Sequence, residues 1–380
     1  MIYFDNAATT MLKPPTVAEA VARAITSFGG VGRGVHEASL DAGMTVFMAR
    51  QKISDLFGGP GAKHVAFASN ITEALNIAIL GLMEPGDHAV TTAASHNSVL
   101  RPLFRLQDAG EADVSVVSIA PDGGVDYDEF DAAFGPKTKL AVIGHASNLT
   151  GDVYDIARMA DIAHSHGALV VIDAAQTAGV MPIDMAAQNL DIVCFTGHKS
   201  LFGPQGTGGL CVAEGIDIKA IKVGGSGTHS YDREHPDFMP EHLEAGTLNA
   251  HGIAGLLAGL TYIEEKGVDA IRERTCMLAD RFEQGIRDIP GIRTYGGGAE
   301  GRTGIVALNL ADVDSSLVAD LLNTQYDICT RAGAHCAPLM HKALGTERQG
   351  AVRFSFSHLN TEEEVDAGIQ ALAEIAQEVC

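Results

Sequence analysis

Tryptophan is absent from this 380-residue chain, and aromatic residues make up only 6% of it. Basic residues are also scarce: 26 lysines and arginines stand against 48 aspartates and glutamates, which gives a formal net charge of −22. Nucleic-acid binding depends on basic patches, so we expect no nucleic-acid partner. No apolar run reaches the roughly 18 residues that a membrane span requires, so we expect no membrane insertion.

Paired cysteines are missing as well. The six cysteines include no C-x-x-C pair, and their spacings match no zinc pattern, so we expect no metal site. The opening sequence, MIYFD, lacks the charged and apolar regions of a signal peptide. We therefore expect a cytoplasmic protein whose thiols are free in a reducing compartment.

Apolar runs alternate with helical segments between residues 60 and 215. This alternation predicts an α/β fold with a mostly parallel sheet that is covered on both faces. Seven runs read as strands of this sheet: 64–68, 89–92, 114–119, 140–145, 168–173, 192–196 and 209–212. The helices expected in this half are 14–28, 41–57, 72–82, 98–108 and 156–166.

The last third of the chain predicts a smaller α/β domain. Residues 251–287 read as helical throughout, and later strands and helices follow at 304–309, 315–323, 351–355 and 361–379. We expect a large domain over 15–250 and a small domain made of 1–14 and 251–380. Residues 224–250 form a long Gly- and His-rich loop, which favours a functional or interface role.

Two residues that follow predicted strands are candidates for cofactor chemistry. Asp173 ends a strongly apolar strand, where ligands of open α/β sheets collect, and could hold a protonated ring nitrogen; the alternative is a helix cap. Lys199 lies between an apolar strand and a Gly-rich turn, a setting that could depress its pKa and allow Schiff-base formation. The alternative for Lys199 is a solvated surface lysine.

Four further positions carry weaker signals. Thr72 lies at a strand-to-helix turn that could bind phosphate or simply cap the helix. Cys336, with His and Gly around it and Arg331 nearby, is a candidate low-pKa thiol, whereas the other five cysteines are expected to be structural. Arg353 lies within a strand-like run and could bind a substrate carboxylate or form an internal ion pair. His96 follows a strand end and could stack on a flat ring or act as acid and base.

In their order and spacing, these segments resemble the class V aminotransferase family of fold-type I pyridoxal-phosphate (PLP) enzymes. The resemblance runs from YFDNAATT at residues 3–10 to VRFS at residues 352–355 and is nearest to the cysteine desulfurase branch. The short segment RAGAHCAP around Cys336 resembles the group II (SufS-like) desulfurases and the selenocysteine lyases. It carries alanine at 334 where group II often has a second histidine.

The resemblance implies roles for individual residues. Lys199 would bind PLP covalently, and Cys336 would receive the sulfur as a persulfide, with His96 stacked on the ring. The other implied cofactor contacts are Asp173, Gln176, Thr72, Thr196, His198 and, from a neighbouring subunit, Thr247. The implied substrate contacts are Arg353, Asn148, His36, Ala8 and Arg331.

The expected reaction converts L-cysteine to L-alanine in a homodimer, with a possible sulfur-acceptor protein as a further partner. Two alternatives within the family stay open: a selenocysteine lyase acting on L-selenocysteine, and another class V reaction such as transamination. A third alternative is a non-catalytic sulfur carrier on the same fold, which would bind no PLP.

Overall fold

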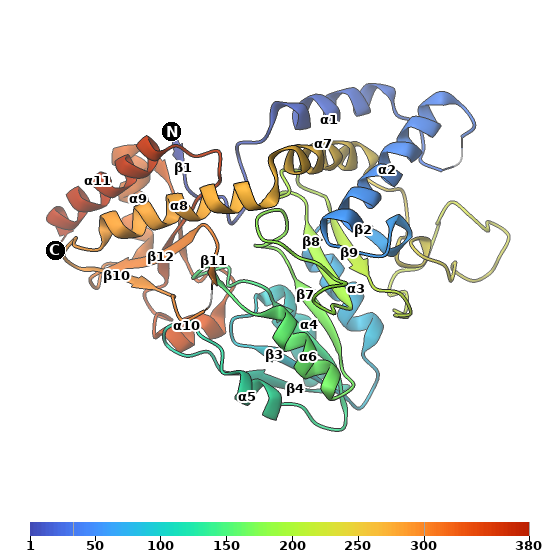
Figure 1. The fold of residues 1–380 in the computed structure, drawn as a ribbon, viewed down its shortest axis with the longest axis horizontal. Helices are drawn as coiled ribbons and strands as arrows, with labels where there is room; N and C mark the ends of the chain where they lie inside the picture. Colours follow the sequence, from blue (N-terminus) through green and yellow to red (C-terminus); the bar gives the residue numbers. More distant parts are fainter. Residues whose placement is uncertain (33, 300, 380) are drawn as a thin grey trace.

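The computed structural model describes residues 1–32, 34–299 and 301–379. Its centre is a seven-stranded sheet in the order β2-β9-β8-β7-β5-β3-β4 (Figure 1). β9 runs antiparallel to both of its neighbours, and the other neighbouring strands run parallel. The bounds are β2 Val65–Ala68, β3 Asp87–Thr92, β4 Ala112–Val117, β5 Thr138–Gly144, β7 Leu169–Asp173, β8 Ile192–Thr196 and β9 Gly208–Val212. The predicted α/β fold with a mostly parallel sheet is therefore confirmed.

Helices cover both faces of this sheet, which explains why its central strands are apolar throughout. In β7, Val171 packs in one core cluster, whereas Val170 and Ile172 pack in the other. The first face is covered by α3 (Ile71–Leu82) and α4 (Asn97–Asp108). The opposite face is covered by α2 (Glu37–Leu56), α6 (Ile156–Ser165) and α7 (Ala250–Lys266). A strand that is buried on both faces carries apolar side chains on both of them, so its sequence does not alternate between apolar and polar residues.

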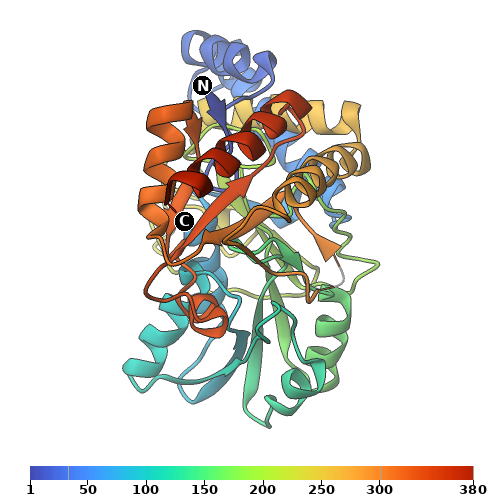
Figure 2. The same ribbon diagram turned by 90° about the vertical axis from the view of Figure 1, so that its left-hand side faces the viewer.

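A second, antiparallel sheet has the order β10-β12-β15-β14. Its strands are β10 Ile292–Tyr295, β12 Ile305–Leu310, β14 Arg331–Gly333 and β15 Ala351–Ser355. A separate core cluster joins this sheet to α8 (Val268–Ile286), α9 (Ser315–Tyr326) and α11 (Glu362–Val379). The N-terminal strand β1 (Ile2–Tyr3) pairs with β13 (Ile328–Cys329), so both ends of the chain lie beside this second sheet (Figures 1 and 2).

The prediction of continuous helix over 251–287 is wrong. Gly267 separates α7 from α8 with a φ of +82°, a left-handed conformation that favours glycine. The two helices pack on different partners. The first, α7, lies along α1 (Pro15–Ser27), and the second, α8, packs on α11 (Figure 1). The remaining short elements are α5 Tyr127–Ala132, β6 Asp152–Val153, β11 Gly301–Arg302, α10 Pro338–Leu344, η1 Ala62–His64 and η2 Glu241–Leu243.

We propose the domain division that the sequence suggested, a large domain over 15–250 and a small domain made of 1–14 and 251–380, although α7, at the start of the second range, packs against the large sheet. The packing of α7 on α1 and α2 makes this helix a bridge between the two parts. Among the described residues, no helix is both long and apolar enough to cross a bilayer.

Candidate active site

A pocket of about 220 Å³ opens between the two sheets, at the carboxyl ends of β5, β7 and β8. Ligands of α/β sheets gather at this edge. Segments from both sheets and from the N-terminus line it. All predicted site residues except His36 and Thr247 are among them: Ala8, Thr72, His96, Asn148, Asp173, Gln176, Thr196, His198, Lys199, Arg331, Cys336 and Arg353.

Lys199 reaches this pocket from the turn after β8. Its side chain is partly buried and lines the pocket. Burial, together with the positive charges of Arg353 and Arg331, lowers the pKa of Lys199 to about 8, although Asp173 opposes the shift. A lysine with a depressed pKa exists partly as the free amine near neutral pH, which is the nucleophilic form.

The N-terminal segment holds the backbone of the Lys199 turn. The carbonyl oxygen of His198 accepts hydrogen bonds from Thr10 N (3.1 Å), Lys13 Nζ (3.2 Å) and Thr9 Oγ1 (3.3 Å). The hydroxyl of Thr10 donates to the carbonyl oxygen of Lys199 at 2.8 Å. These bonds tie the backbone of the Lys199 turn to the N-terminal segment, up to 189 positions earlier in the sequence.

Asp173 is buried at the end of β7, and the desolvation raises its pKa. Ala175 N donates to its Oδ1 at 2.9 Å, and within the described part of the chain no hydrogen bond occupies Oδ2. A buried carboxylate with a spare oxygen suits a cationic N–H donor. Beside it, Gln176 Nε2 donates to the carbonyl oxygen of Ala7 at 3.2 Å.

The N-terminus of α3 provides a place for phosphate. Asn70 caps this 12-residue helix by accepting from Glu73 N at 3.0 Å, which leaves the amides of Ile71 and Thr72 without intrahelical partners. Free amides and the positive end of the helix dipole bind anions. Thr72, Thr196 and His198 also line this pocket.

His96 is the N-cap of α4. Its Nδ1 accepts a hydrogen bond from Ser98 N at 3.0 Å, so the ring proton of the neutral form lies on Nε2. Burial and the nearby charges of Lys199 and Arg353 lower the pKa of His96 to about 4. The imidazole is therefore neutral at physiological pH, the form that stacks on a flat ring without repelling a protonated one.

Arg353 is buried in β15, directly across from Arg331 in β14. Its Nη1 donates to the carbonyl oxygen of Asn148 at 2.8 Å, and its Nη2 pairs with Asp5 Oδ1 at 3.0 Å. Its Nε is buried and has no hydrogen-bond partner. The guanidinium is thus fixed by the fold on one side and keeps a donor for a carboxylate on the other.

Cys336 is exposed in the short turn between β14 and α10. Its carbonyl oxygen accepts a hydrogen bond from Asn97 N at 2.9 Å, and Asn148 Nδ2 donates to the carbonyl oxygen of His335 at 2.7 Å. The side-chain NH₂ of Asn148 therefore binds the turn beside the thiol, and its Oδ1 is buried without a hydrogen-bond partner.

The other cysteines were expected to be structural. The thiols of Cys194 and Cys211 are buried and have raised pKa values, as expected of structural cysteines. Cys380 lies outside the described residues.

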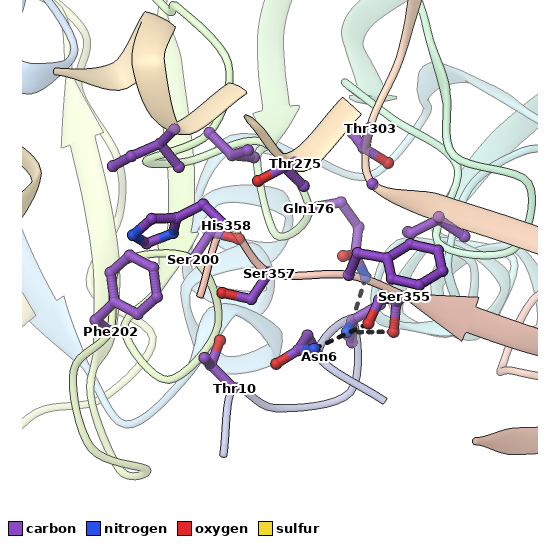
Figure 3. A pocket seen from close by; sticks show the side chains of 16 residues that line it. Asn6, Thr10, Gln176, Ser200, Phe202, Thr275, Thr303, Ser355, Ser357 and His358 are labelled. Carbon is purple, nitrogen blue, oxygen red and sulfur yellow. Dashed lines mark hydrogen bonds between the residues drawn. The ribbon is translucent and has the colours of Figure 1, made fainter. Parts of the chain in front are cut away.

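His36 and Thr247 lie outside this pocket. His36 is exposed at the N-cap of α2, and Thr247 is exposed and lines a separate cavity of about 130 Å³ with Ser69 and Lys222. A third, smaller space of about 30 Å³ lies between the N-terminal segment and the end of β15 (Figure 3). Ala7 and Gln176 line both this space and the main pocket.

The residues present fit PLP. The anion site at α3, the spare oxygen of Asp173, the neutral ring of His96 and the buried amine of Lys199 match, respectively, the phosphate, the pyridine nitrogen, the ring face and the aldehyde of this cofactor. PLP would supply an electron sink conjugated to the α-carbon of a bound amino acid.

Sequence reasoning missed two residues of the site. Asp5 was recognised only as part of the opening motif, yet it pairs with Arg353, which lies 348 positions away. His335 was recognised only as a neighbour of Cys336, yet its buried ring lines the pocket. The periodicity of a segment describes only residues that are near one another in the sequence, so it cannot reveal a contact between residues so far apart in the chain. The buried charge of Arg353, which needs a partner, was the only available signal for Asp5.

Comparisons with known proteins agree with this geometry. The sequence profile of the aminotransferase class-V family matches residues 2–367. A probable cysteine desulfurase of Methanothermobacter thermautotrophicus is 33% identical, over 99% of this chain and 94% of that protein. The cysteine desulfurase CsdA of Escherichia coli is 30% identical, over 98% of this chain and 93% of that protein.

Solved structures give the same result. The apo structure of the cysteine desulfurase from Thermococcus onnurineus superposes with a TM-score of 0.92 at 31% identity, covering 100% of this chain and 95% of that one. The Escherichia coli CsdA structure, in its S-sulfonic acid form, gives a TM-score of 0.89 at 29% identity, covering 99% of this chain and 94% of that one. This chain therefore belongs to the class V aminotransferase family.

Proposed function

We propose that the protein is a PLP-dependent cysteine desulfurase, which converts L-cysteine to L-alanine and transfers the sulfur to Cys336 as a persulfide. The observation that carries this proposal is the convergence of Lys199, Asp173, Arg353 and an exposed thiol, Cys336, on one pocket. A lysine and an aspartate alone would serve many PLP reactions. The thiol beside the carboxylate-binding arginine favours sulfur transfer, and the relatives reported above are named cysteine desulfurases.

Arg353 is the proposed anchor for the substrate carboxylate. Its unpartnered Nε and the second hydrogen of Nη2 form one edge of the guanidinium, which matches the two oxygens of a carboxylate. Asp5 and Asn148 hold the opposite side of the group, so it need not reorient when substrate binds. Arg331, across the strand pair, adds positive charge at the mouth of the site.

Lys199 and Asp173 are the proposed partners of the cofactor. Lys199 would hold it covalently and, when freed, would provide the amine that takes the proton from the substrate α-carbon. Its lowered pKa, about 8, permits this role because part of the amine is unprotonated near neutral pH. Asp173 would pair with the ring nitrogen through its spare oxygen.

Cys336 is the proposed sulfur acceptor. Its thiolate attacks the substrate sulfur, which forms an S–S bond and breaks the bond between the substrate β-carbon and its sulfur. The electron pair of the broken bond stays with the carbon, and protonation of that carbon gives alanine. The sulfur remains on Cys336 as a persulfide, ready for an acceptor protein that approaches from solvent.

The test is to incubate the purified, PLP-loaded protein with L-cysteine, measure alanine, and search by mass spectrometry for one added sulfur atom on the Cys336 peptide. The Cys336→Ser variant should keep the absorbance of bound PLP but form no persulfide. Cys329→Ser, which changes another partly exposed cysteine, serves as the matched control and should behave as wild type.

Other outcomes decide between the alternatives. Release of a keto acid in place of alanine would show transamination. Unchanged desulfuration by Cys336→Ser would contradict its role as acceptor. A much faster reaction with L-selenocysteine, insensitive to the same substitution, would show a selenocysteine lyase. A colourless protein that binds no PLP would favour a non-catalytic carrier.

We further propose a homodimer of the group II type. The dimer is supported by His36 and Thr247, which lie outside the pocket formed by their own chain, and by an apolar stripe on α2. This stripe consists of Leu40, Met44 and Phe47, which are 60%, 59% and 52% exposed. The short turn that carries Cys336 supports the group II assignment. Cys194, Cys211, Cys276 and Cys329 are all free thiols, which supports a reducing, cytoplasmic setting.

A further inference from the structure

The turn that presents Cys336 has an unfavourable backbone conformation. His335 and Cys336 are consecutive non-glycine residues with φ values of +49° and +55°, both in the left-handed region. Only a few per cent of non-glycine residues adopt this conformation, with asparagine, aspartate and histidine enriched among them, so two such residues in succession are unusual. Such a turn persists only where the surrounding structure holds it.

The backbone of the turn is held from the side of the large sheet. Asn148 Nδ2 donates to the carbonyl oxygen of His335 at 2.7 Å, and Asn97 N donates to that of Cys336 at 2.9 Å. Because Asn148 also accepts from Arg353 through its own carbonyl oxygen, the turn is connected to the carboxylate-binding group by a single residue. The turn and the proposed substrate anchor are therefore parts of one hydrogen-bonded unit.

The ring of His335 anchors the turn on the side of the small sheet. His335 is 5% exposed, and its Nε2 donates to the carbonyl oxygen of Arg331 at 3.2 Å. The ring stacks on that of His341, with centroids 6.0 Å apart and planes inclined by 17°. His341 is fixed in turn by Thr346, whose hydroxyl lies 2.7 Å from its Nδ1.

Both rings are neutral at physiological pH. Burial and the charges of Arg353 and Arg331 lower the pKa of His335 to about 3, and burial also lowers the pKa of His341. His335 Nδ1 is buried without a partner. The mechanism proposed above does not use this ring, and its burial keeps it from acting as an exposed acid. Its hydrogen bond and its ring contact instead indicate a structural role, in which the ring packs inside the protein and holds the turn.

We propose that His335 is a positioning residue for sulfur transfer, whose buried ring, stacked on His341, holds the strained turn that presents the Cys336 thiol to the substrate. This inference deepens the proposed function and rests on it. It assigns two different roles within this turn. Cys336 accepts the sulfur, and His335 fixes the position of the Cys336 thiol.

The test compares His335→Asn and His335→Ala with wild type. Asparagine tolerates the left-handed conformation but removes the ring, so it separates the role of the ring from that of the backbone. We expect the rate of persulfide formation to fall at least tenfold in both variants, with less than a twofold change in KM for L-cysteine and in bound PLP. His358→Asn, which removes a partly buried ring that lies edge-on to Phe202 and is hydrogen-bonded to Tyr262, is the matched control and should keep the wild-type rate.

Hydrogen–deuterium exchange gives a readout that does not depend on turnover. Amides of residues 334–337 should exchange faster in His335→Asn than in wild type or His358→Asn. Exchange at the wild-type rate, or persulfide formation within twofold of wild type in His335→Asn, would overturn the positioning role. Loss of PLP in proportion to activity would also overturn it, since the ring would then support the whole pocket. A wild-type protein that forms no alanine would refute the proposed function, whereas the exchange measurement would still decide the role of His335.

Discussion

Asp5 and Arg353 form an ion pair of 3.0 Å that joins the N-terminal segment to the second sheet, across 348 positions of sequence. Together with Asn148, which accepts from Nη1, Asp5 fixes the orientation of the guanidinium by accepting from Nη2. A buried arginine without such partners would carry a large desolvation cost. The group proposed to bind the substrate carboxylate is therefore held in place by the fold itself.

Arg353→Lys should raise KM for L-cysteine by roughly 10- to 100-fold, because a lysine ammonium cannot present two parallel donors to a carboxylate. Absorbance of bound PLP should change little, since Arg353 is not among its expected contacts. Steady-state kinetics measures the effect, and Arg348→Lys, at an exposed position, is the control. An unchanged KM would place the substrate carboxylate on another group, with Arg331 the first candidate.

Lys199→Arg should remove the covalent attachment of PLP and lower turnover by about a thousandfold or more, because arginine keeps the charge but forms no Schiff base. Borohydride reduction followed by peptide mass spectrometry should find the cofactor on residue 199 in wild type only. Lys63→Arg, on the surface, controls for the substitution itself. Covalent PLP on a different lysine would contradict the assignment.

The buried pair between Arg50 and Glu244 should matter for stability. Both terminal nitrogens of Arg50 donate to Glu244, at 2.7 and 2.8 Å, and Glu244 also accepts from Phe67 N. Arg50→Met leaves a buried carboxylate unpaired and should cost about 3–5 kcal/mol of unfolding free energy, measured by urea denaturation. Lys52→Met breaks an exposed pair with Glu264 and should cost less than about 1 kcal/mol. Similar losses in both variants would contradict this difference.

Stability should fall on mild acidification. Burial lowers the pKa of His145 to about 4, against 6.5 for an exposed histidine. Above pH 6.5 the folded and unfolded states are both neutral at this residue, whereas between about pH 6.5 and 4 only the unfolded state takes up the proton. His145 therefore contributes stability above pH 6.5 that is lost as the pH falls.

The His145→Leu variant isolates this contribution. The loss of unfolding free energy between pH 7.5 and pH 5 should be smaller in the variant by up to about 2 kcal/mol. Denaturation at the two pH values measures it, and each protein serves as its own reference. An equal loss in both proteins would assign the acid sensitivity to other histidines with lowered pKa values, such as His198 and His358.

The large sheet was predictable from sequence because its physical cause is local. A strand such as Leu169–Asp173, buried on both faces, leaves an unbroken apolar run, and the polar residue that ends it marks the ligand edge. The break at Gly267 was not predictable in the same way. A single glycine inside a helical pattern is often tolerated, and only the packing of α7 and α8 on different partners requires the left-handed turn.

The pairing of residues across the site was the least predictable feature. Neither Asp5 nor His335 differs from its neighbours in periodicity, and their importance arises from contacts made only in the folded chain. His36 and Thr247 show a different limit. The role predicted for Thr247 depends on a second subunit, and His36, which was predicted to line the pocket, lies outside the pocket of its own chain.

The participation of the N-terminal segment has a consequence for biosynthesis. The pocket combines Ala7 and Ala8, which precede Lys199 in the chain, with Arg353, which follows it. During translation the Lys199 turn therefore leaves the ribosome before the strand that carries Arg353. Because every proposed PLP contact also precedes Arg353, the residues proposed to bind the cofactor are all translated before the residue proposed to bind the substrate carboxylate.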